Sequence, residues 1–499
     1  MDVALTPIDF LERARRVFPT RAGVVEGDQR WTYEEFAQRC HRLAHALIND
    51  LGIRPGDRVA YLCGNTHEML EAYFGVVMTG AILAPLNIRL SPPELRGILD
   101  DSGAGVLIRH PDQPDPQHGV RQVVMGDELE ALLDAQPSQP FERATIDEHD
   151  PAEIFYTSGS TGEPKGVVLS HRALYLHAVH SALTLGITGD DVVLHTIPLF
   201  HVNGWGTPHY LTGLGGVHVM LPRFDPAEVL ALVETHRVTR LYLVPAMAGA
   251  ILAEPSLDAR DLSSLDQVSI GGAAAPPSMI AEVEERMGCE CICGYGLTEA
   301  SPQLTKALDK PGEPRSRKRR STTGLPILGV ELRVTDDHGA EVPRDGVSPG
   351  EISVRSNHVM TGYWNRPDET AEAIRDGWLH TGDVAVIDTD GYVTIVDRKK
   401  DLIVSGGENV SSVEVEKAIA AHPAVADVAV VGVADATWGE VPKAWVVLHS
   451  DAAATEAELI EWVRDRLAHF KAPREVAFVD DLPRGGTGKV DKRELRARG

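Results

Sequence analysis

The stretch YTSGSTGEPKG occupies residues 156–166 and follows the apolar residues Ile154 and Phe155. It is rich in hydroxyl groups and glycines, and Lys165 stands near its end. Glycines let the backbone turn its N–H groups toward an anion, while the hydroxyls add donors and the lysine adds charge. The spacing differs from the GxxxxGK[ST] phosphate-binding pattern. The stretch therefore predicts a phosphate-binding loop entered from a strand, and the alternative is a flexible Gly/Ser loop.

The chain has 499 residues, which is too long for one hydrophobic core and predicts roughly two to four units. With 48 Lys+Arg against 73 Asp+Glu, the net charge of −25 argues against a nucleic-acid or anionic-membrane binder. We find no apolar run long enough for a signal-peptide core or a membrane span. Five cysteines in so long a chain make no disulfide framework. We therefore expect a cytoplasmic protein that holds phosphate locally.

Short apolar strands alternate with amphipathic helices over the first half of the chain, which predicts α/β architecture with parallel sheets covered on both faces. The predicted strands are 59–63, 82–86, 105–108, 192–197, 216–220, 241–244 and 267–270, and the predicted helices are 32–47, 67–78, 92–100, 226–235 and 277–287. Thr32 and Glu35 predict a capping box at the start of the first of these helices. After residue 324, strands at 330–334, 350–354 and 391–396 predict a small antiparallel unit. Beyond DRKKD at 397–401, helices at 413–421 and 456–470 and strands at 426–432 and 443–448 predict a compact α+β domain.

The loop at 156–166 resembles the nucleotide-binding signature of the adenylate-forming (AMP-binding, ANL) superfamily, which includes acyl-CoA synthetases, adenylation domains and luciferases. Further blocks follow in the family's order: GGAAAP at 271–276, GYGLTEA at 294–300, WLHTGD at 378–383, SGG at 405–407 and PRGGTGK at 483–489. The text FHVNGW at 200–205 resembles medium- and long-chain fatty acyl-CoA ligases more than aryl ligases. The resemblance implies a large N-terminal domain at 1–397, built of two parallel-rich αβ subdomains and a small β-barrel-like subdomain. A small mobile α+β domain at 398–499 would follow, with a hinge at about Lys400.

The resemblance also implies ligands for ATP, Mg²⁺ and coenzyme A. Tyr295 would stack on adenine, Asp383 would accept hydrogen bonds from both ribose hydroxyls, and Glu299 with Thr157 would ligate Mg²⁺ through hard oxygen atoms. The implied nucleotide and CoA ligands are Thr157, Ser158, Gly159, Ser160, Thr161, Lys165, Gly272, Ala273, Ala274, Gly294, Tyr295, Gly296, Thr298, Asp383, Arg398, Lys400, Ser405, Gly406, Gly407 and Lys489. Thr298 and Glu299 could instead cap a helix, Asp383 could be a solvated turn residue, and the glycines of GGAAAP suit a tight turn almost as well.

Catalysis would depend on Lys489, because adenylation forces a carboxylate onto a phosphate and a positioned ammonium offsets the gathering negative charge. Taken alone, this residue would be an ordinary surface lysine. The implied catalytic set is Lys489, Glu299, Thr157 and His201. Lys400 would change its backbone torsions when the small domain rotates, and Gly406 would leave room for the pantetheine thiol.

The implied substrate pocket is lined by His201, Val202, Asn203, Trp205, Gly271 and Gly296. Trp205 would gate the entrance to an acyl tunnel, and the alternative is a tryptophan buried for packing.

We therefore expect an ATP-dependent acyl-CoA synthetase that forms acyl-AMP with release of pyrophosphate and then transfers the acyl group to CoA, with a medium- or long-chain fatty acid as substrate. The alternative is a stand-alone adenylation enzyme that loads an aryl or amino acid onto a carrier protein, although residues 198–205 contain no acid to pair with a substrate ammonium. A luciferase-like oxygenase and a degenerate binding protein are further alternatives, the last disfavoured because Lys165, Glu299 and Lys489 are all present. The expected partners are the small acid, ATP and CoA, with no nucleic acid, no integral membrane segment, and a homodimer as in some relatives.

Two other segments stand out. Cys289, Cys291 and Cys293 alternate, so on a strand they would share one face. We expect them to be buried as small hydrophobic residues, with a metal site as the alternative that lacks CxxC spacing. The basic segment PRSRKRR at 314–320 predicts a solvated mobile loop, and the alternative is local attraction for the phosphates of CoA.

Overall fold

The computed structural model describes residues 3–137, 139–158, 164–273, 275–398, 401–405, 408–435, 438–467, 469–485 and 490–498. The chain divides into two compact units, Met1–Glu331 with Val354–Leu379 and Leu332–Ser353 with His380–Gly499. The predicted hinge residue Lys400 lies outside the described residues, so a boundary at 397/398 stays a prediction.

A nine-stranded sheet in the first unit has the order β15-β14-β13-β12-β11-β9-β10-β1-β2. Its strands are β1 (Ala22–Glu26), β2 (Gln29–Thr32), β9 (Val192–His195), β10 (Val217–Met220), β11 (Arg240–Leu243), β12 (Gln267–Ile270), β13 (Glu290–Gly296), β14 (Gln303–Lys306) and β15 (Leu325–Pro326). Pairing is parallel from β1 through β13, and antiparallel strands close both edges. The central strands match the sequence expectation, whereas β1 joins from the distant N-terminus and was not predicted.

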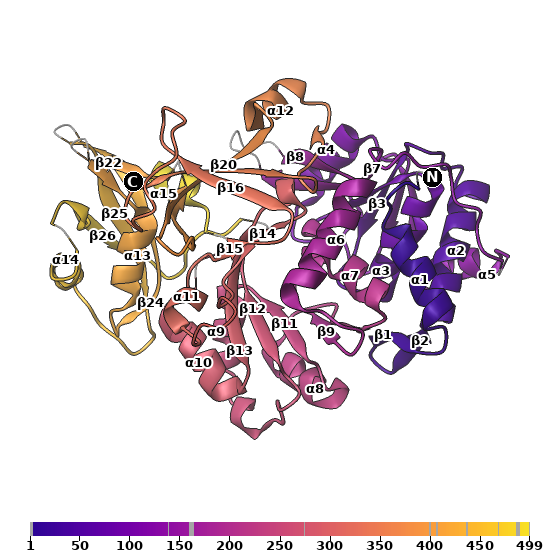
Figure 1. Ribbon diagram of the computed structural model, residues 1–499, viewed down its shortest axis with the longest axis horizontal. Coiled ribbons are helices and arrows are strands. Elements are labelled where there is room, and N and C mark those ends of the chain that lie inside the picture. Colours follow the sequence, from indigo (N-terminus) through magenta and orange to yellow (C-terminus); the bar gives the residue numbers. More distant parts are fainter. Residues whose placement is uncertain are drawn as a thin grey trace. The chain divides into compact units, whose positions relative to one another are not determined.

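Helices cover both faces of this sheet, as expected from the alternation of strands and helices. On one face, α8 (Pro226–His236), α9 (Pro245–Leu252) and α10 (Pro277–Met287) pack on a cluster that includes Leu241 and Val268 (Figure 1). On the other face, α6 (His171–Leu185) and α7 (Thr207–Leu214) pack on a cluster that includes Val193, Tyr242 and Ile292. Successive strand residues point to opposite faces, so each central strand contributes to both clusters.

A seven-stranded sheet, also in the first unit, has the order β18-β8-β7-β4-β3-β5-β6. Its strands are β3 (Arg58–Leu62), β4 (Ile82–Pro85), β5 (Val106–Arg109), β6 (Arg121–Val124), β7 (Pro151–Ser158), β8 (Pro164–Ser170) and β18 (Gly362–Tyr363). Strands β3 to β7 are parallel, and β8 and β18 are antiparallel at the edge.

The remaining helices of the first unit include α2 (Tyr33–Asn49), which begins at the predicted capping box: the backbone N of Glu35 donates to Thr32 Oγ1 at 3.3 Å and the backbone N of Thr32 donates to Glu35 Oε2 at 2.8 Å. The other short elements are α1 (Ile8–Val17), α3 (His67–Gly75), η1 (Val77–Thr79), α4 (Pro92–Ser102), α5 (Asp127–Asp134), η2 (Val202–Gly206), η3 (Leu257–Ala259), η4 (Thr298–Ala300), α11 (Arg317–Arg320), α12 (Pro367–Ala373) and β19 (Ile374–Arg375).

The second unit contains antiparallel strands followed by the predicted α+β domain. The antiparallel strands are β16 (Val330–Thr335), β17 (Gly350–Ser356), β20 (Trp378–Ile387) and β21 (Val393–Arg398). The α+β part has strands β22 (Ile403–Ser405), β23 (Glu408–Val410), β24 (Val425–Asp435), β25 (Gly439–Leu448) and β26 (Glu475–Phe478), and helices α13 (Ser412–Ala420), α14 (Glu456–Arg464), η5 (His469–Lys471) and α15 (Lys492–Arg498). Helix α14 is shorter than predicted, because Leu467 packs on the core from a turn and so continues the apolar pattern beyond the helix.

Candidate active site

The predicted phosphate-binding loop connects two strands of a hairpin. Strands β7 and β8 pair antiparallel up to Thr157 with Lys165 and Ser158 with Pro164. The loop tip, with Gly159, Ser160 and Thr161, lies outside the described residues. A hairpin fixes both ends of this loop, so Thr157 and Lys165 stand directly opposite each other at its base.

Lys165 is held by two residues that sequence reasoning missed. Its Nζ forms an ion pair with Glu369, at the start of α12, and lies 5.3 Å from the centroid of the Tyr363 ring. The hydrogen bond from Lys165 lowers the pKa of Glu369 below its usual value. The lysine charge is thus paired with the Glu369 carboxylate, and a bound phosphate would compete with Glu369 for it.

Tyr363 also connects Lys165 to Glu299. Its hydroxyl donates to Glu299 Oε1 at 2.9 Å. Burial and the negative charge of Glu299 raise the pKa of Tyr363 well above its usual value, so the phenol stays protonated and donates. Glu299 lies in η4, which begins after Leu297 and has no side-chain hydrogen bond at its N-terminus. Thr298 and Glu299 are part of this short helix and do not cap it. Thr298 is buried and Tyr295 half-buried on β13.

The predicted pocket segment after His201 has an unusual backbone. Five consecutive residues, all buried, have positive φ: Val202 (38°), Asn203 (43°), Gly204 (52°), Trp205 (64°) and Gly206 (85°). Such angles are unfavourable for Val and Trp, whose side chains crowd the backbone, and they persist only where the surroundings enforce them.

Glu153 on β7 holds this segment. Asn203 Nδ2 donates to Glu153 Oε2 at 3.2 Å, and His209 Nε2 on α7 lies 3.2 Å from Glu153 Oε1. Glu153, Asn203 and His209 are each fully buried. The strand that leads into the phosphate-binding loop therefore also fixes the pocket segment.

The Trp205 side chain is enclosed by residues at or just beyond the carboxyl ends of the parallel strands β11, β12 and β13 and by Lys306 on the antiparallel strand β14. We define the Trp205 wall as Trp205, Tyr242, Gly271, Gly294 and Lys306. The rings of Trp205 and Tyr242 meet edge to face with centroids 6.1 Å apart. A Cβ on Gly271 would lie 2.9 Å from Trp205 Cη2, and Lys306 Nζ lies 5.9 Å from the Trp205 ring centroid. Gly272 (φ 77°) and Ala273 follow Gly271 and are exposed, whereas Ala274 lies outside the described residues.

Two glycines of the predicted blocks have a packing role. Gly166 lies inside β8, where a Cβ would be 2.9 Å from Ile154, so it does not turn its N–H toward an anion as we expected. A Cβ on Gly296 would stand 2.0 Å from the carbonyl oxygen of Pro302, because the β13–β14 hairpin closes there. Both positions exclude a side chain for reasons of backbone approach.

In the second unit, two predicted ribose ligands are cross-strand partners. Asp383 on β20 pairs with Arg398 on β21, and Arg398 Nε lies 3.0 Å from Asp383 Oδ1. The neighbouring Asp397 accepts hydrogen bonds from the backbone N and Oγ of Ser412 at 2.5 and 3.1 Å, which joins the predicted hinge region to α13. Ser405 is buried at the end of β22, while Lys400, Gly406, Gly407 and Lys489 lie outside the described residues.

The two remaining segments are packed into the first unit. Our expectation of a solvated basic loop is wrong for Arg319 and Arg320, whose side chains are 20% and 6% exposed. Arg320 pairs with Glu284, and Arg319 Nε lies 3.0 Å from Asp309. Glu284 is 36 residues from Arg320 and Asp309 is 10 residues from Arg319, so both partners lie outside the run of basic residues that we interpreted.

Cys291 and Cys293 lie on β13 and join the hydrophobic core, and Cys289, just before this strand, packs against the core. Burial raises the pKa of the Cys289 thiol to about 12. These thiols therefore pack as small apolar side chains, as expected.

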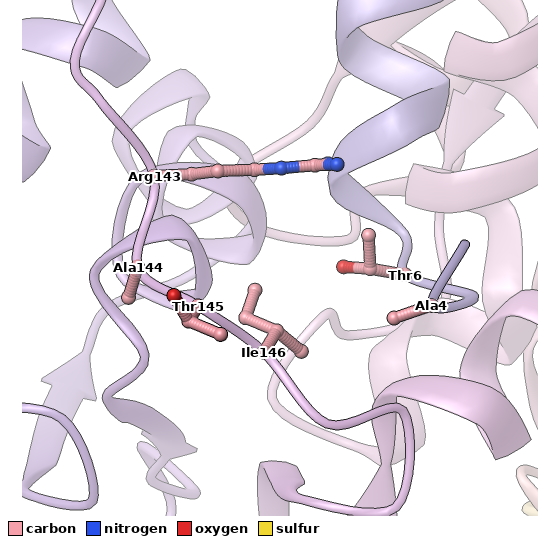
Figure 2. A pocket seen from close by; sticks show the side chains of 6 residues that line it. All are labelled: Ala4, Thr6, Arg143, Ala144, Thr145 and Ile146. Carbon is pink, nitrogen blue, oxygen red and sulfur yellow. The ribbon is translucent and has the colours of Figure 1, made fainter. Parts of the chain in front are cut away.

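A surface pocket of about 260 Å³ is lined by residues near the N-terminus and by residues 143–146, which precede the phosphate-binding block. Figure 2 shows its lining residues, Ala4, Thr6, Arg143, Ala144, Thr145 and Ile146. Arg143 is already paired with Asp9 at 2.6 Å, and Thr6 Oγ1 lies 2.9 Å from His171 Nδ1. No predicted site residue lines this pocket, so we do not connect it with the chemistry.

Two family models match the chain. The model described as AMP-binding enzyme matches residues 11–364, which is more than half of the 499 residues. The model described as AMP-binding enzyme C-terminal domain matches residues 414–489. The chain belongs to the AMP-binding enzyme family. The resemblance read from the sequence blocks is confirmed at the level of the superfamily.

The names of relatives of this AMP-binding enzyme refer to different acids. A feruloyl-CoA synthase from an Amycolatopsis species is 41% identical over 491 residues, 97% of each chain. A long-chain-fatty-acid–CoA ligase from Thermus thermophilus is 38% identical over 520 residues, covering 99% of this chain and 96% of the relative. The solved structure of the anthranilate CoA ligase AuaEII with anthranoyl-AMP has a TM-score of 0.90 at 29% identity, covering 100% and 98% of the two chains.

This AMP-binding enzyme is an AMP-forming acid–thiol ligase: it uses ATP to convert a carboxylic acid into an acyl-AMP and transfers the acyl group to CoA. The predicted α/β fold, with a large N-terminal and a small C-terminal domain, is confirmed. Likeness to fatty acyl-CoA ligases is one of several likenesses within the family. Among the described residues, no helix is long and apolar enough to span a membrane.

Proposed function

We propose that this AMP-binding enzyme is a CoA ligase for a compact aromatic carboxylic acid, whose ring lies against the Trp205 wall. The carrying observation is that Trp205 is held on three sides, by Tyr242, Gly271 and Lys306. In this proposal the fixed indole limits the length of the acid that the enzyme accepts. It also offers a flat surface suited to contact with another ring. The 41% identity to a feruloyl-CoA synthase supports an aromatic substrate.

A medium- or long-chain fatty acid is the second candidate. The FHVNGW text and the 38% identity to a long-chain-fatty-acid–CoA ligase favour it. In that case Trp205 is a gate, and it must break its contacts with Tyr242 and Lys306 to admit the chain. The carrier-loading adenylation enzyme differs from both only in the acceptor of the acyl group.

We propose that ATP binds at the hairpin and the residues around it. Lys165 and the loop hold phosphates, Thr298 contacts the α-phosphate region, and Tyr295 stacks on adenine. Glu299 and Thr157 hold Mg²⁺, which suits the site because Tyr363 engages only Oε1 of Glu299 and a second oxygen is available to a hard cation. Asp383 binds the ribose, and Arg398 turns from Asp383 to the nucleotide.

The remaining assignments rest on the sequence. Lys489 stabilises the adenylation transition state, Lys400 is the hinge, and Ser405, Gly406 and Gly407 border the pantetheine path. His201 lies at the start of the pocket segment, next to the reacting carboxylate. A homodimer and a cytoplasmic location complete the proposal.

The test is pyrophosphate release with and without CoA over a panel of benzoates, cinnamates and straight-chain acids, with thioesters identified by mass. We expect CoA-dependent thioester formation to be most efficient with the aromatic acids. Preference for straight-chain acids of eight or more carbons would favour the fatty-acid candidate, and pyrophosphate release without any thioester would favour the carrier-loading enzyme.

A further inference from the structure

Lys306 is a buried lysine at the end of β14. Only 3% of its surface is exposed, and it stands directly opposite Gly294 on β13. A Cβ on Gly294 would lie 2.8 Å from Lys306 Cδ and 2.9 Å from its Nζ. The side chain therefore lies across the space that the glycine leaves empty, and its ammonium points toward Trp205.

The Lys306 ammonium has no counter-ion among the residues that the structure describes. No described group accepts a hydrogen bond from its Nζ or forms an ion pair with it, and Nζ lies 5.9 Å from the centroid of the Trp205 ring. Burial lowers the pKa of Lys306 to about 8, so most molecules still carry the charge near neutral pH. Lysines are almost never fully buried without a partner, because an unpaired buried charge is costly. The missing partner is expected to be a ligand.

The position of Lys306 matches a substrate site. Gly271 follows β12, and Gly294 lies near the carboxyl end of β13. Ligands of open α/β sheets bind at the carboxyl ends of the parallel strands. Lys306 shares this edge with Trp205 and Gly271, which belong to the predicted acyl pocket.

We propose that Lys306 binds a second oxygen function of the substrate acid, a phenolic hydroxyl or a second carboxylate located at the end remote from the carboxylate that is activated. The inference rests on the proposed function, because it assigns a substituent to the acid that lies against the Trp205 wall. The ammonium donates a hydrogen bond to this oxygen and gains a partner that the described residues of the chain do not supply. No covalent step is involved.

Three acids of one skeleton separate the sources of the oxygen: cinnamate, 4-hydroxycinnamate and 4-carboxycinnamate. Each is assayed for pyrophosphate release and thioester formation with the parent enzyme and with Lys306→Met, which keeps the length of the side chain and removes the charge. Lys318→Met makes the same change at an exposed lysine and serves as the matched control. Thermal melts accompany every variant.

We expect the parent to prefer one oxygenated acid over cinnamate by about tenfold or more in kcat/KM, as for a charge-assisted hydrogen bond. Lys306→Met should reduce this preference to about threefold or less, because kcat/KM falls more for the oxygenated acid than for cinnamate, and it should melt no lower than the parent, because it removes an unpaired buried charge. Lys318→Met should change neither. The preferred acid identifies the oxygen as hydroxyl or carboxylate.

An equal loss of kcat/KM for all three acids together with a lower melting temperature would make Lys306 a packing residue and overturn the inference. An unchanged preference in Lys306→Met would overturn it as well. If the enzyme turns over only straight-chain acids, the aromatic proposal fails on its own. The same variants are then compared on an unsubstituted acid and its ω-hydroxy and ω-carboxy forms, where an unchanged preference again rejects the role of Lys306.

Discussion

Tyr363 donates a 2.9 Å hydrogen bond to Glu299, and the same ring lies 5.3 Å from the ammonium of Lys165. One tyrosine thus joins the base of the phosphate-binding hairpin to the carboxylate proposed to hold Mg²⁺. All three residues belong to the first unit, so neither contact depends on the second unit.

Glu299→Gln is expected to raise the Mg²⁺ concentration needed for half-maximal pyrophosphate release, because an amide oxygen carries no net charge for a hard cation. Glu331→Gln, an exposed glutamate paired with Arg355 on the surface, is the control. A Mg²⁺ titration of Glu299→Gln that superimposes on that of the parent would remove Glu299 from the metal site.

Lys165→Met is expected to raise KM for ATP about tenfold, which corresponds to the loss of one charge-assisted hydrogen bond. Glu369→Gln should leave that KM unchanged or lower it, since it frees Lys165 from its ion pair. Steady-state pyrophosphate release over a range of ATP concentrations measures both. If KM for ATP rose equally in the two variants, the Lys165–Glu369 ion pair would serve to shape the loop, and Lys165 would not bind phosphate.

Lys489→Ala is expected to slow acyl-AMP formation by about 10²-fold, the size of one preorganised charge at a transition state. Thioester formation from supplied acyl-AMP should change little. The two half-reactions are followed separately by rapid quench, and near-normal adenylation by this variant would contradict the assignment made from the sequence block.

Trp205→Ala distinguishes a wall from a gate. If the ring is part of a fixed wall, its loss should lower the free energy of unfolding by about 3–5 kcal/mol and broaden the range of accepted acids. If it is a gate, stability should be nearly unchanged and chain-length preference should shift. Urea denaturation beside the acid panel gives the answer.

His67 predicts a pH dependence of stability. Burial alone lowers its pKa, but the hydrogen bond with Glu26 and the charges of Glu71 and Glu68 outweigh this effect and raise the pKa to about 8. The folded-state pKa is above the unfolded value, so the stabilisation is complete below about pH 6.5 and is lost as the pH rises through about 8. We expect the free energy of unfolding to fall by about 1–2 kcal/mol across this window, and less in His67→Gln. Urea denaturation at pH 6 and 8.5 measures this change. If the free energy of unfolding changed equally between the two pH values in the parent and in His67→Gln, the assignment would be contradicted.

Local patterns predicted the elements that local chemistry determines. The Thr32/Glu35 capping box, strand β12 and helix α10 were found where the sequence placed them, because caps and apolar periodicity act over a few residues. The family blocks also predicted that Thr157, Lys165 and Glu299 share one site. In the structure Thr157 stands opposite Lys165, and Tyr363 contacts both Lys165 and Glu299.

The residues that complete the site could not be found in this way. Glu369, Tyr363 and Glu153 act through partners far away in the chain, and nothing in their own surroundings marks them. Lys306 could have been noticed as the single charged residue in the segment QLTKAL. Its burial, however, depends on Gly294, its partner across the hairpin. Pairing partners of this kind become visible only when strands are placed side by side.

The link from Glu153 to Asn203 also limits how the enzyme can be re-engineered. Residues 201–206 look like a short loop that could be exchanged between ligases to alter their choice of acid. The left-handed backbone of residues 202–206 is held by the Glu153 carboxylate on β7, which contacts Asn203 and also His209 beyond the loop. A chimera that carries the loop without Glu153 and His209 would therefore adopt another backbone in this segment. Its substrate range would then reflect the changed backbone and not the chemistry of the transplanted side chains.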